Sequence, residues 1–137
     1  MNFYVDFTPI SVILYYMTIK KNRTFSDLEF NDHANTANAV HAKLDLGNDT
    51  EISVVSMRNK ETEFGSLYGS VEAGTYEVAV FHHGNMIPLS PYDDVLGWQT
   101  KDELNELMAK LQNDGESFIA ELYFCRDESK AKLMASE

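Results

Sequence analysis

The clearest regular pattern in the chain is an alternation of apolar and polar residues between positions 39 and 58. In AVHAKLDL the apolar side chains fall on every second residue, which is typical of a strand with one buried face. Gly47 and Asn48 follow in GNDT and tolerate the positive φ of a tight turn. EISVVSMR then supplies a return strand, so we predict a β-hairpin over residues 39–58.

Further strands are indicated on both sides of this hairpin. TFSDLEF favours a short strand before it, and TYEVAVFHH repeats the alternating pattern after it. MIPLSPY is expected to run back at the edge of the sheet, because Pro88 and Pro91 cannot donate to a ladder. The glycine-containing residues 59–74 predict a long irregular connection, with one short strand around residues 67–68.

The segment TKDELNELMAKLQ predicts a helix over residues 100–112. Thr100 and Glu103 have the spacing of a capping box, and the apolar residues that follow form a single stripe. Residues 117–125 fit either a strand or a short helix, and both alternatives remain open. A frayed polar tail is expected at 127–137.

Together these elements predict one α+β domain over residues 1–137. Its small antiparallel sheet has about three to five strands, with at least one helix packed on it. The apolar residues 1–23 are expected to be an edge strand or an N-terminal extension. Their apolar run after Pro9 is too short to span a bilayer, and no basic leader precedes it. Met17 is an alternative start, which would leave residues 1–16 outside the working protein.

Composition supports a folded domain, and charge supplies the first functional indication. The chain is 44% hydrophobic and 12% aromatic, so disorder of the whole chain is not expected. Its formal net charge is −11, and residues 61–100 contain six acids and no Lys or Arg. A field of one sign attracts basic surfaces and repels nucleic acid and anionic membranes, so we expect neither of these as a direct partner. The single Cys125 excludes an internal disulfide and is interpreted as a small core residue of a protein in a reducing cytoplasm.

Candidate catalytic and metal-binding residues are few. His82, His83, Asp93 and Asp94 have side chains that suit a transition metal. However, neighbouring strand residues point to opposite faces, so the two histidines are not expected to share one ion. A catalytic carboxylate pair at 93–94 is also weaker than the alternative, in which one acid caps a turn and Val95, Leu96 and Trp98 fill the core beneath the helix. We therefore predict no enzyme, no cofactor and no metal.

The acidic residues around the predicted helix are the best candidates for contact with a partner. On a helix, Asp102 and Glu106 lie about 6 Å apart, a spacing at which carboxylates can stand in for the phosphates of a duplex. Glu77 and Glu103 are expected to be structural, because one lies on a strand and the other caps its own helix. The predicted partner-binding residues are Glu72, Tyr92, Asp93, Asp94, Trp98, Asp102 and Glu106.

Four segments resemble a family of short proteins encoded by tailed bacteriophages. They are FSDLEF, HAKLDLGNDTEISVV, YGSVEAGTYEVAVFHHG and DDVLGWQTKDELNELMAKLQ, which lie between residues 25 and 111 or just beyond. No activity is assigned to that family, so no site residue follows from the resemblance. It implies a small protein made in the cytoplasm of an infected bacterium.

Three functional hypotheses follow, from different classes. The first is an acidic protein that binds and inhibits a basic host protein, one that handles nucleic acid, as a counter-defence or host-takeover inhibitor and as a nucleic-acid mimic. The second is an accessory or structural phage protein that forms a homo-oligomer. The third is a metal-dependent enzyme that uses His82, Asp93 or Asp94.

Overall fold

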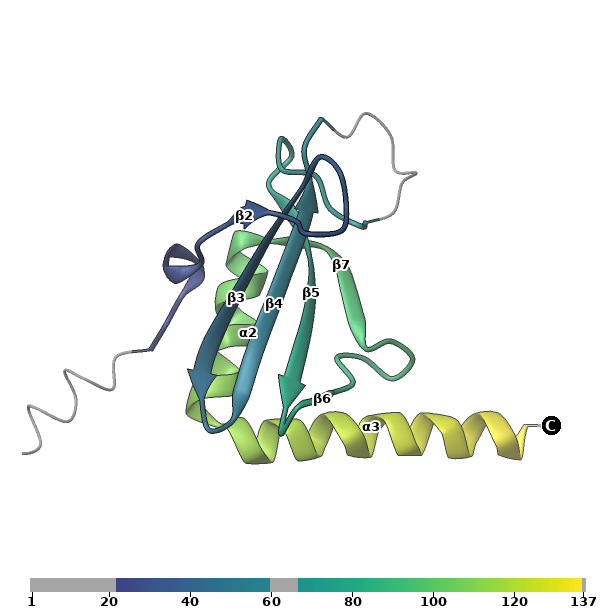
Figure 1. The fold of residues 1–137 in the computed structure, drawn as a ribbon. Coiled ribbons are helices and arrows are strands. Elements are labelled where there is room, and N and C mark those ends of the chain that lie inside the picture. Colours follow the sequence, from purple (N-terminus) through teal and green to yellow (C-terminus); the bar gives the residue numbers. More distant parts are fainter. Residues whose placement is uncertain (1–21, 60–66, 137) are drawn as a thin grey trace, which may run out of the picture.

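The computed structural model describes residues 22–59 and 67–136, and within them it contains one antiparallel sheet and two α-helices (Figure 1). The predicted α+β fold is confirmed. The elements in chain order are a 3₁₀ helix η1 (Phe25–Asp27), strands β2 (Asn31–Asp32), β3 (Ala39–Gly47), β4 (Thr50–Met57), β5 (Thr75–His82), β6 (Asn85–Met86) and β7 (Val95–Thr100), and helices α2 (Lys101–Asn113) and α3 (Gly115–Ala135). The strand order is β2-β3-β4-β5-β6, and β7 also pairs with β5.

The predicted hairpin is confirmed as strands β3 and β4. Ala42 lies opposite Val54, and both side chains are buried on the helix-covered face. The tight turn places Gly47, Asn48 and Asp49 at positive φ, which glycine and the short polar side chains of Asn and Asp tolerate best. The predicted strand at 75–83 is confirmed as β5, which pairs with β4.

The free edge of β5 is divided between two strands. β6 pairs with its last residues, Phe81 and His82, so only Met86 of the predicted return segment MIPLSPY lies in a strand, and residues 87–92 form none. β7 pairs with the first part of β5, from Thr75 to Ala79. This strand was not predicted, because residues 95–98 were expected to fill the core beneath the helix.

A β-bulge interrupts the pairing of β7 with β5. Leu96 pairs with Val78 and Gln99 pairs with Tyr76, so Gly97 and Trp98 together lie opposite the single residue Glu77. A bulge of this kind breaks the alternation of side chains along a strand. That explains why the pattern of residues 95–100 did not indicate a strand.

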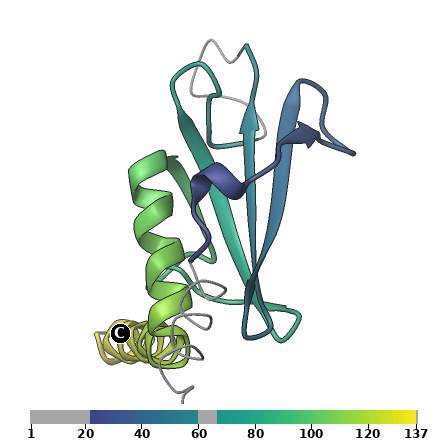
Figure 2. The ribbon, with the colours of Figure 1, turned by 90° about the vertical axis from the view of Figure 1, so that its left-hand side faces the viewer.

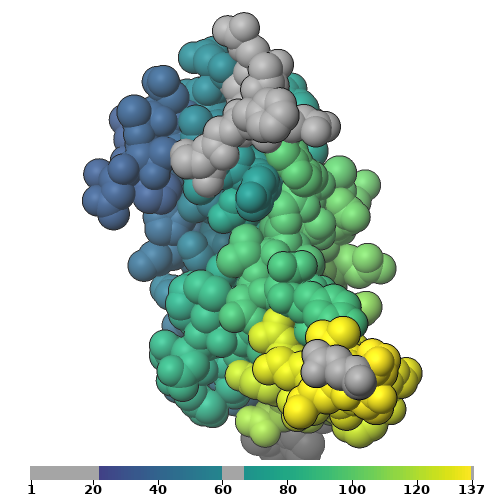
Figure 3. All heavy atoms as spheres, turned by 90° about the vertical axis from the view of Figure 1, so that its right-hand side faces the viewer, coloured from purple at the N-terminus to yellow at the C-terminus, as the bar shows by residue number. Residues whose placement is uncertain are grey.

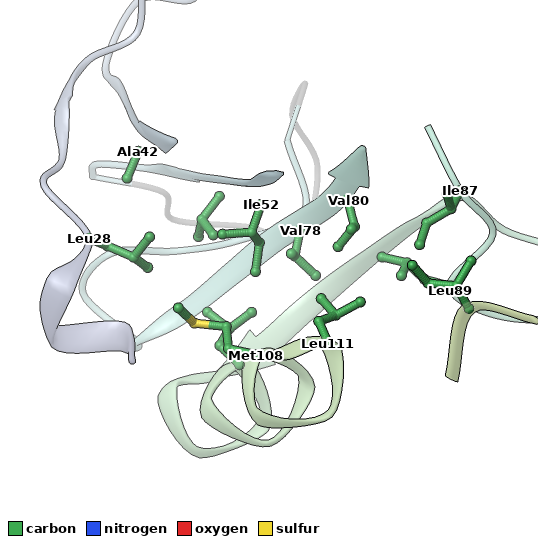
Figure 4. Packing of buried hydrophobic residues seen from close by; sticks show 12 residues of the cluster. Leu28, Ala42, Ile52, Val78, Val80, Ile87, Leu89, Met108 and Leu111 are labelled. Atoms are coloured by element: carbon green, nitrogen blue, oxygen red, sulfur yellow. The ribbon is translucent and has the colours of Figure 1, made fainter. Parts of the chain in front are cut away.

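Helix α2 covers one face of the sheet (Figure 2). Leu104 and Met108 are fully buried and belong to one cluster with Ile52 and Val78 from the sheet (Figure 4). The predicted capping box is present, since the Thr100 hydroxyl accepts a hydrogen bond from the Glu103 amide and the Glu103 carboxylate accepts one from the Thr100 amide. The helix and its apolar stripe were therefore predicted correctly.

Three local predictions were wrong. Phe25–Asp27 form η1 instead of a strand, because the Asp27 carboxylate accepts a hydrogen bond from the Thr24 amide and closes a helical turn. Residues 67–68 form no strand, although neighbouring Ser70 makes a single bridge to Met57. The expected frayed tail from residue 127 is instead the second half of α3, whose Ala, Glu, Lys and Leu residues are strong helix formers.

Helix α3 runs past the end of the sheet, and most of its length is exposed (Figure 1). Ile119, at 6% exposure, is the one buried residue of this helix. Cys125 is exposed, so its interpretation as a core residue was wrong. Neither α2 nor α3 is long and apolar enough to cross a membrane, and no other helix within the described residues is. The expectation of a strand at 1–23 falls almost entirely on residues 1–21, outside the described part.

Candidate functional site

The predicted partner-binding residues lie at two opposite ends of strand β7. Tyr92, Asp93 and Asp94 directly precede β7, and we call them the loop end. Asp102 and Glu106 follow the strand on α2, and Glu72 lies in the turn before Thr75, which pairs with Thr100. Together with Trp98, these three acids form what we call the α2 end. A strand of six residues spans about 20 Å, so the structure separates the two groups.

At the loop end, Asp94 is engaged by Arg126 of α3. The guanidinium group donates to the Asp94 carboxylate at 2.5 Å and to the carbonyl oxygens of Ser90 and Pro91 at 3.2 Å each. The Arg126 side chain is only 17% exposed. Asp94 therefore fastens the loop to α3, and its charge is compensated locally, which makes it a poor contact for a basic partner.

The other two loop-end residues are more accessible. The Tyr92 side chain is largely exposed, and the Asp93 carboxylate lies on the surface. The carbonyl oxygen of Asp93 accepts hydrogen bonds from the amides of Leu89 and Ser90, which closes the turn before β7. Their exposure keeps both residues available as contacts, although they lie apart from the acids of α2.

At or near the α2 end, two acids accept hydrogen bonds from the backbone and two are exposed to solvent. Glu103 takes part in the capping box. Both carboxylate oxygens of Glu72 accept a hydrogen bond from the Asn59 amide, at 2.9 and 3.0 Å. Asp102 and Glu106 are exposed on the first two turns of α2. These two carboxylates are the part of the predicted site that the fold presents most directly to solvent.

A pair of partly exposed aromatic side chains includes Trp98 of the α2 end. The rings of Tyr68 and Trp98 have centroids 6.2 Å apart and are inclined at 53°. Trp98 was predicted as a contact residue, whereas Tyr68 was not, because it lies in a glycine-rich connection without periodicity. In the sequence, the glycines at 69 and 97 could have indicated this contact, since each allows a close approach of two backbone segments.

His82 and His83, at the C-terminal end of β5, have neighbouring rings, although adjacent residues of a strand point to opposite faces. His83 lies beyond β5 at φ 52°, so its ring turns back to within 3.9 Å of the His82 ring, centroid to centroid. His83 pairs with Asp49 at 2.7 Å, and His82 shares a hydrogen bond with Thr50 at 2.9 Å. Across residues 22–59 and 67–136, no three His, Cys, Asp or Glu side chains are grouped so as to hold a metal ion.

His41 lies on the sheet face opposite α2. Its ring stacks on His33 with centroids 5.3 Å apart, and its Nε2 atom lies 2.8 Å from the Ser53 hydroxyl. Burial lowers the pKa of His41, and the nearby His33 and Lys43 lower it further, while Glu51 acts in the opposite direction. The neutral ring is therefore favoured in the folded protein.

No family model, curated protein or solved structure matches this chain. The function must therefore be inferred from the surface itself.

Proposed function

We propose that this protein binds and inhibits a basic protein of a host bacterium, in the cytoplasm of an infected cell. The observation that carries the proposal is the pair of exposed carboxylates on α2, Asp102 and Glu106, which lie one helical turn apart. The partner is a protein that handles nucleic acid, because carboxylates at this spacing stand in for phosphates. The resemblance to short proteins of tailed bacteriophages supplies the biological context.

Long-range electrostatics support this function. A net charge of −11 attracts basic surfaces over roughly 8 Å at physiological ionic strength. Such a field mainly increases the rate of association and disfavours partners of the same sign. Asp94 at the loop end is paired with Arg126, whereas Asp102 and Glu106 are exposed carboxylates on α2.

Exposed acids on α3 provide a matched test. The variant Asp102→Lys/Glu106→Lys reverses two exposed charges at the α2 end. The control Glu121→Lys/Glu128→Lys makes the same change in net charge at exposed positions on α3. None of these four side chains takes part in a cap or a buried contact, so both proteins are expected to fold.

The experiment is affinity capture from nuclease-treated bacterial lysate, identification by mass spectrometry, and measurement of Kd for the purified partner. We expect the α2-end variant to weaken binding at least about tenfold and the control to weaken it much less, since close charge pairs contribute several kcal/mol at interfaces. Binding to wild type should also weaken steeply with added salt. Tight binding that survives both the α2-end reversal and high salt would overturn the proposal.

A second function, an accessory phage protein that forms a homo-oligomer, is favoured by a different observation. Helix α3 exposes the apolar side chains of Tyr123, Phe124, Leu133 and Met134, and exposed apolar side chains of this kind favour self-association. The C-terminal part of α3, yellow in Figure 3, lies at the surface on this side of the molecule. Light scattering over a range of concentrations tests it. A stable dimer or larger assembly at micromolar concentration would favour this function, and a monomer throughout would remove it.

A further inference from the structure

The bulge in β7 places Trp98 in an unusual backbone conformation. Its φ of 56° lies in the left-handed region, which a bulky residue without special constraints rarely adopts. The Trp98 amide donates to the carbonyl oxygen of Tyr68 at 2.8 Å, which holds the bulge in place. Strained backbone of this kind is found preferentially at functional sites, where the surrounding structure maintains it.

Tyr68 is fixed on the same bulge from two sides. Its carbonyl oxygen accepts from Trp98, and its amide donates to the Glu77 carboxylate at 2.8 Å. A Cβ atom on Gly97 would lie only 2.5 Å from the Cβ of Tyr68, and one on Gly69 would lie 2.9 Å from the Thr75 carbonyl oxygen. The two glycines therefore allow the segment around Tyr68 to lie directly on the sheet.

These contacts fix two aromatic rings at the surface without burying them. Tyr68 remains 54% exposed and Trp98 remains 39% exposed. Tyr and Trp dominate the binding energy of many protein interfaces, since they supply a large contact area from few rotatable bonds. The rings, together with the Glu77 carboxylate, form a small preorganised surface of π faces and negative charge.

We propose that Tyr68 and Trp98 bind an arginine side chain of the basic partner by stacking, beside the carboxylate of Glu77. This inference rests on the proposed function, and it specifies the chemistry of one contact within that interface. A cation is favoured over an apolar side chain because the protein is strongly acidic and both rings attract positive charge through their faces. Arginine is favoured over lysine because its planar guanidinium group stacks on a ring while its N–H groups remain available to a carboxylate.

The chain contains a single tryptophan, so Trp98 reports on its own site. The experiment titrates the full-length protein with an oligoarginine peptide and with an oligolysine peptide of equal length, and follows Trp98 emission and the anisotropy of labelled peptide. We expect oligoarginine to quench Trp98 in a saturable way and to bind roughly three- to tenfold more tightly than oligolysine, the range of a partly exposed cation–π contact.

Two substitutions at Tyr68 and one control sharpen the test. Tyr68→Leu removes the π face of this ring but keeps an apolar side chain over Gly97, so it should clearly reduce the preference for oligoarginine, with Trp98 still contributing. Tyr68→Phe keeps the π face and should preserve the preference for arginine. Phe124→Ala removes an exposed aromatic residue on α3, outside the predicted contact residues, and should change neither affinity. Thermal unfolding followed by circular dichroism checks that each variant is folded.

The outcomes separate this inference from the proposed function. Equal affinity of wild type for both peptides, or an arginine preference that Tyr68→Leu leaves intact, would overturn the stacking site while leaving the charge-based function in place. Failure of both peptides to bind at low salt would count against the charge-based function as well.

Discussion

The contact between Arg126 and the loop before β7 leads to a quantitative prediction for stability. Arg126→Ala removes a guanidinium group that donates to the Asp94 carboxylate and to the carbonyl oxygens of Ser90 and Pro91. Hydrogen bonds that involve a charged group contribute about 1.5–3 kcal/mol when they are shielded from water. The Asp94 side chain is 43% exposed, so water replaces part of what is lost. We therefore expect the free energy of unfolding to fall by about 1–2 kcal/mol.

Urea unfolding followed by circular dichroism measures this change, and for a domain of this size it corresponds to a fall in Tm of roughly 3–7 °C. Lys130→Ala is the control, because Lys130 lies exposed on the same helix, and surface substitutions usually change stability by less than about 0.5 kcal/mol. A double-mutant cycle with Asp94→Asn should give a coupling energy of about 0.5–1.5 kcal/mol. If Arg126→Ala is no more destabilising than Lys130→Ala, the loop is not fastened by this contact, and Asp94 returns to the set of free surface acids.

Three further perturbations test other features of the fold. Thr100→Ala removes the hydroxyl that caps α2 and should cost about 1 kcal/mol in chemical unfolding, whereas Thr100→Ser should cost much less. Gly97→Ala places a methyl group against the Tyr68 side chain and should displace it, which a changed Trp98 emission spectrum would reveal; an unchanged spectrum would argue against the tight packing. The pKa of His41 should lie below 6.5 in an NMR titration of the folded protein. Because the unfolded chain then binds more protons just below pH 6.5, the free energy of unfolding should fall as pH is lowered through that value, and His41→Gln should reduce the fall.

The hairpin and helix α2 could be predicted because their determinants are local. Alternation over 39–58 and a capping box at Thr100 are complete within the segments that they specify. Strand β7 could not be predicted, since it depends on the partner β5 and on a bulge that removes the periodic signal. The length of α3 was missed because its polar residues show no apolar stripe, and intrinsic helix propensity maintains it beyond the body of the protein.

The residues of the candidate site were predicted better than their arrangement in space. Proximity in sequence suggested that the acids at 93–94 and at 102–106 act together, but the unpredicted strand between them places them at opposite ends. Tyr68 was not identified, because its position depends on hydrogen bonds to Glu77 and Trp98 from distant parts of the chain. Aromatic residues that are placed by tertiary contacts carry no periodic signal of their own.

The order of the strands also bears on how quickly the chain folds. Within the described residues, β2, β3, β4, β5 and β6 each pair with the strand next to them in sequence, and β7 skips only the two-residue β6. Pairings between neighbours require the closure of short loops, and topologies of this type fold faster than those with many distant contacts. The connection between β4 and β5 is the longest between consecutive strands. The entropic cost of closing it is modest, because this cost grows only slowly with loop length. We expect the sheet to form within milliseconds to seconds.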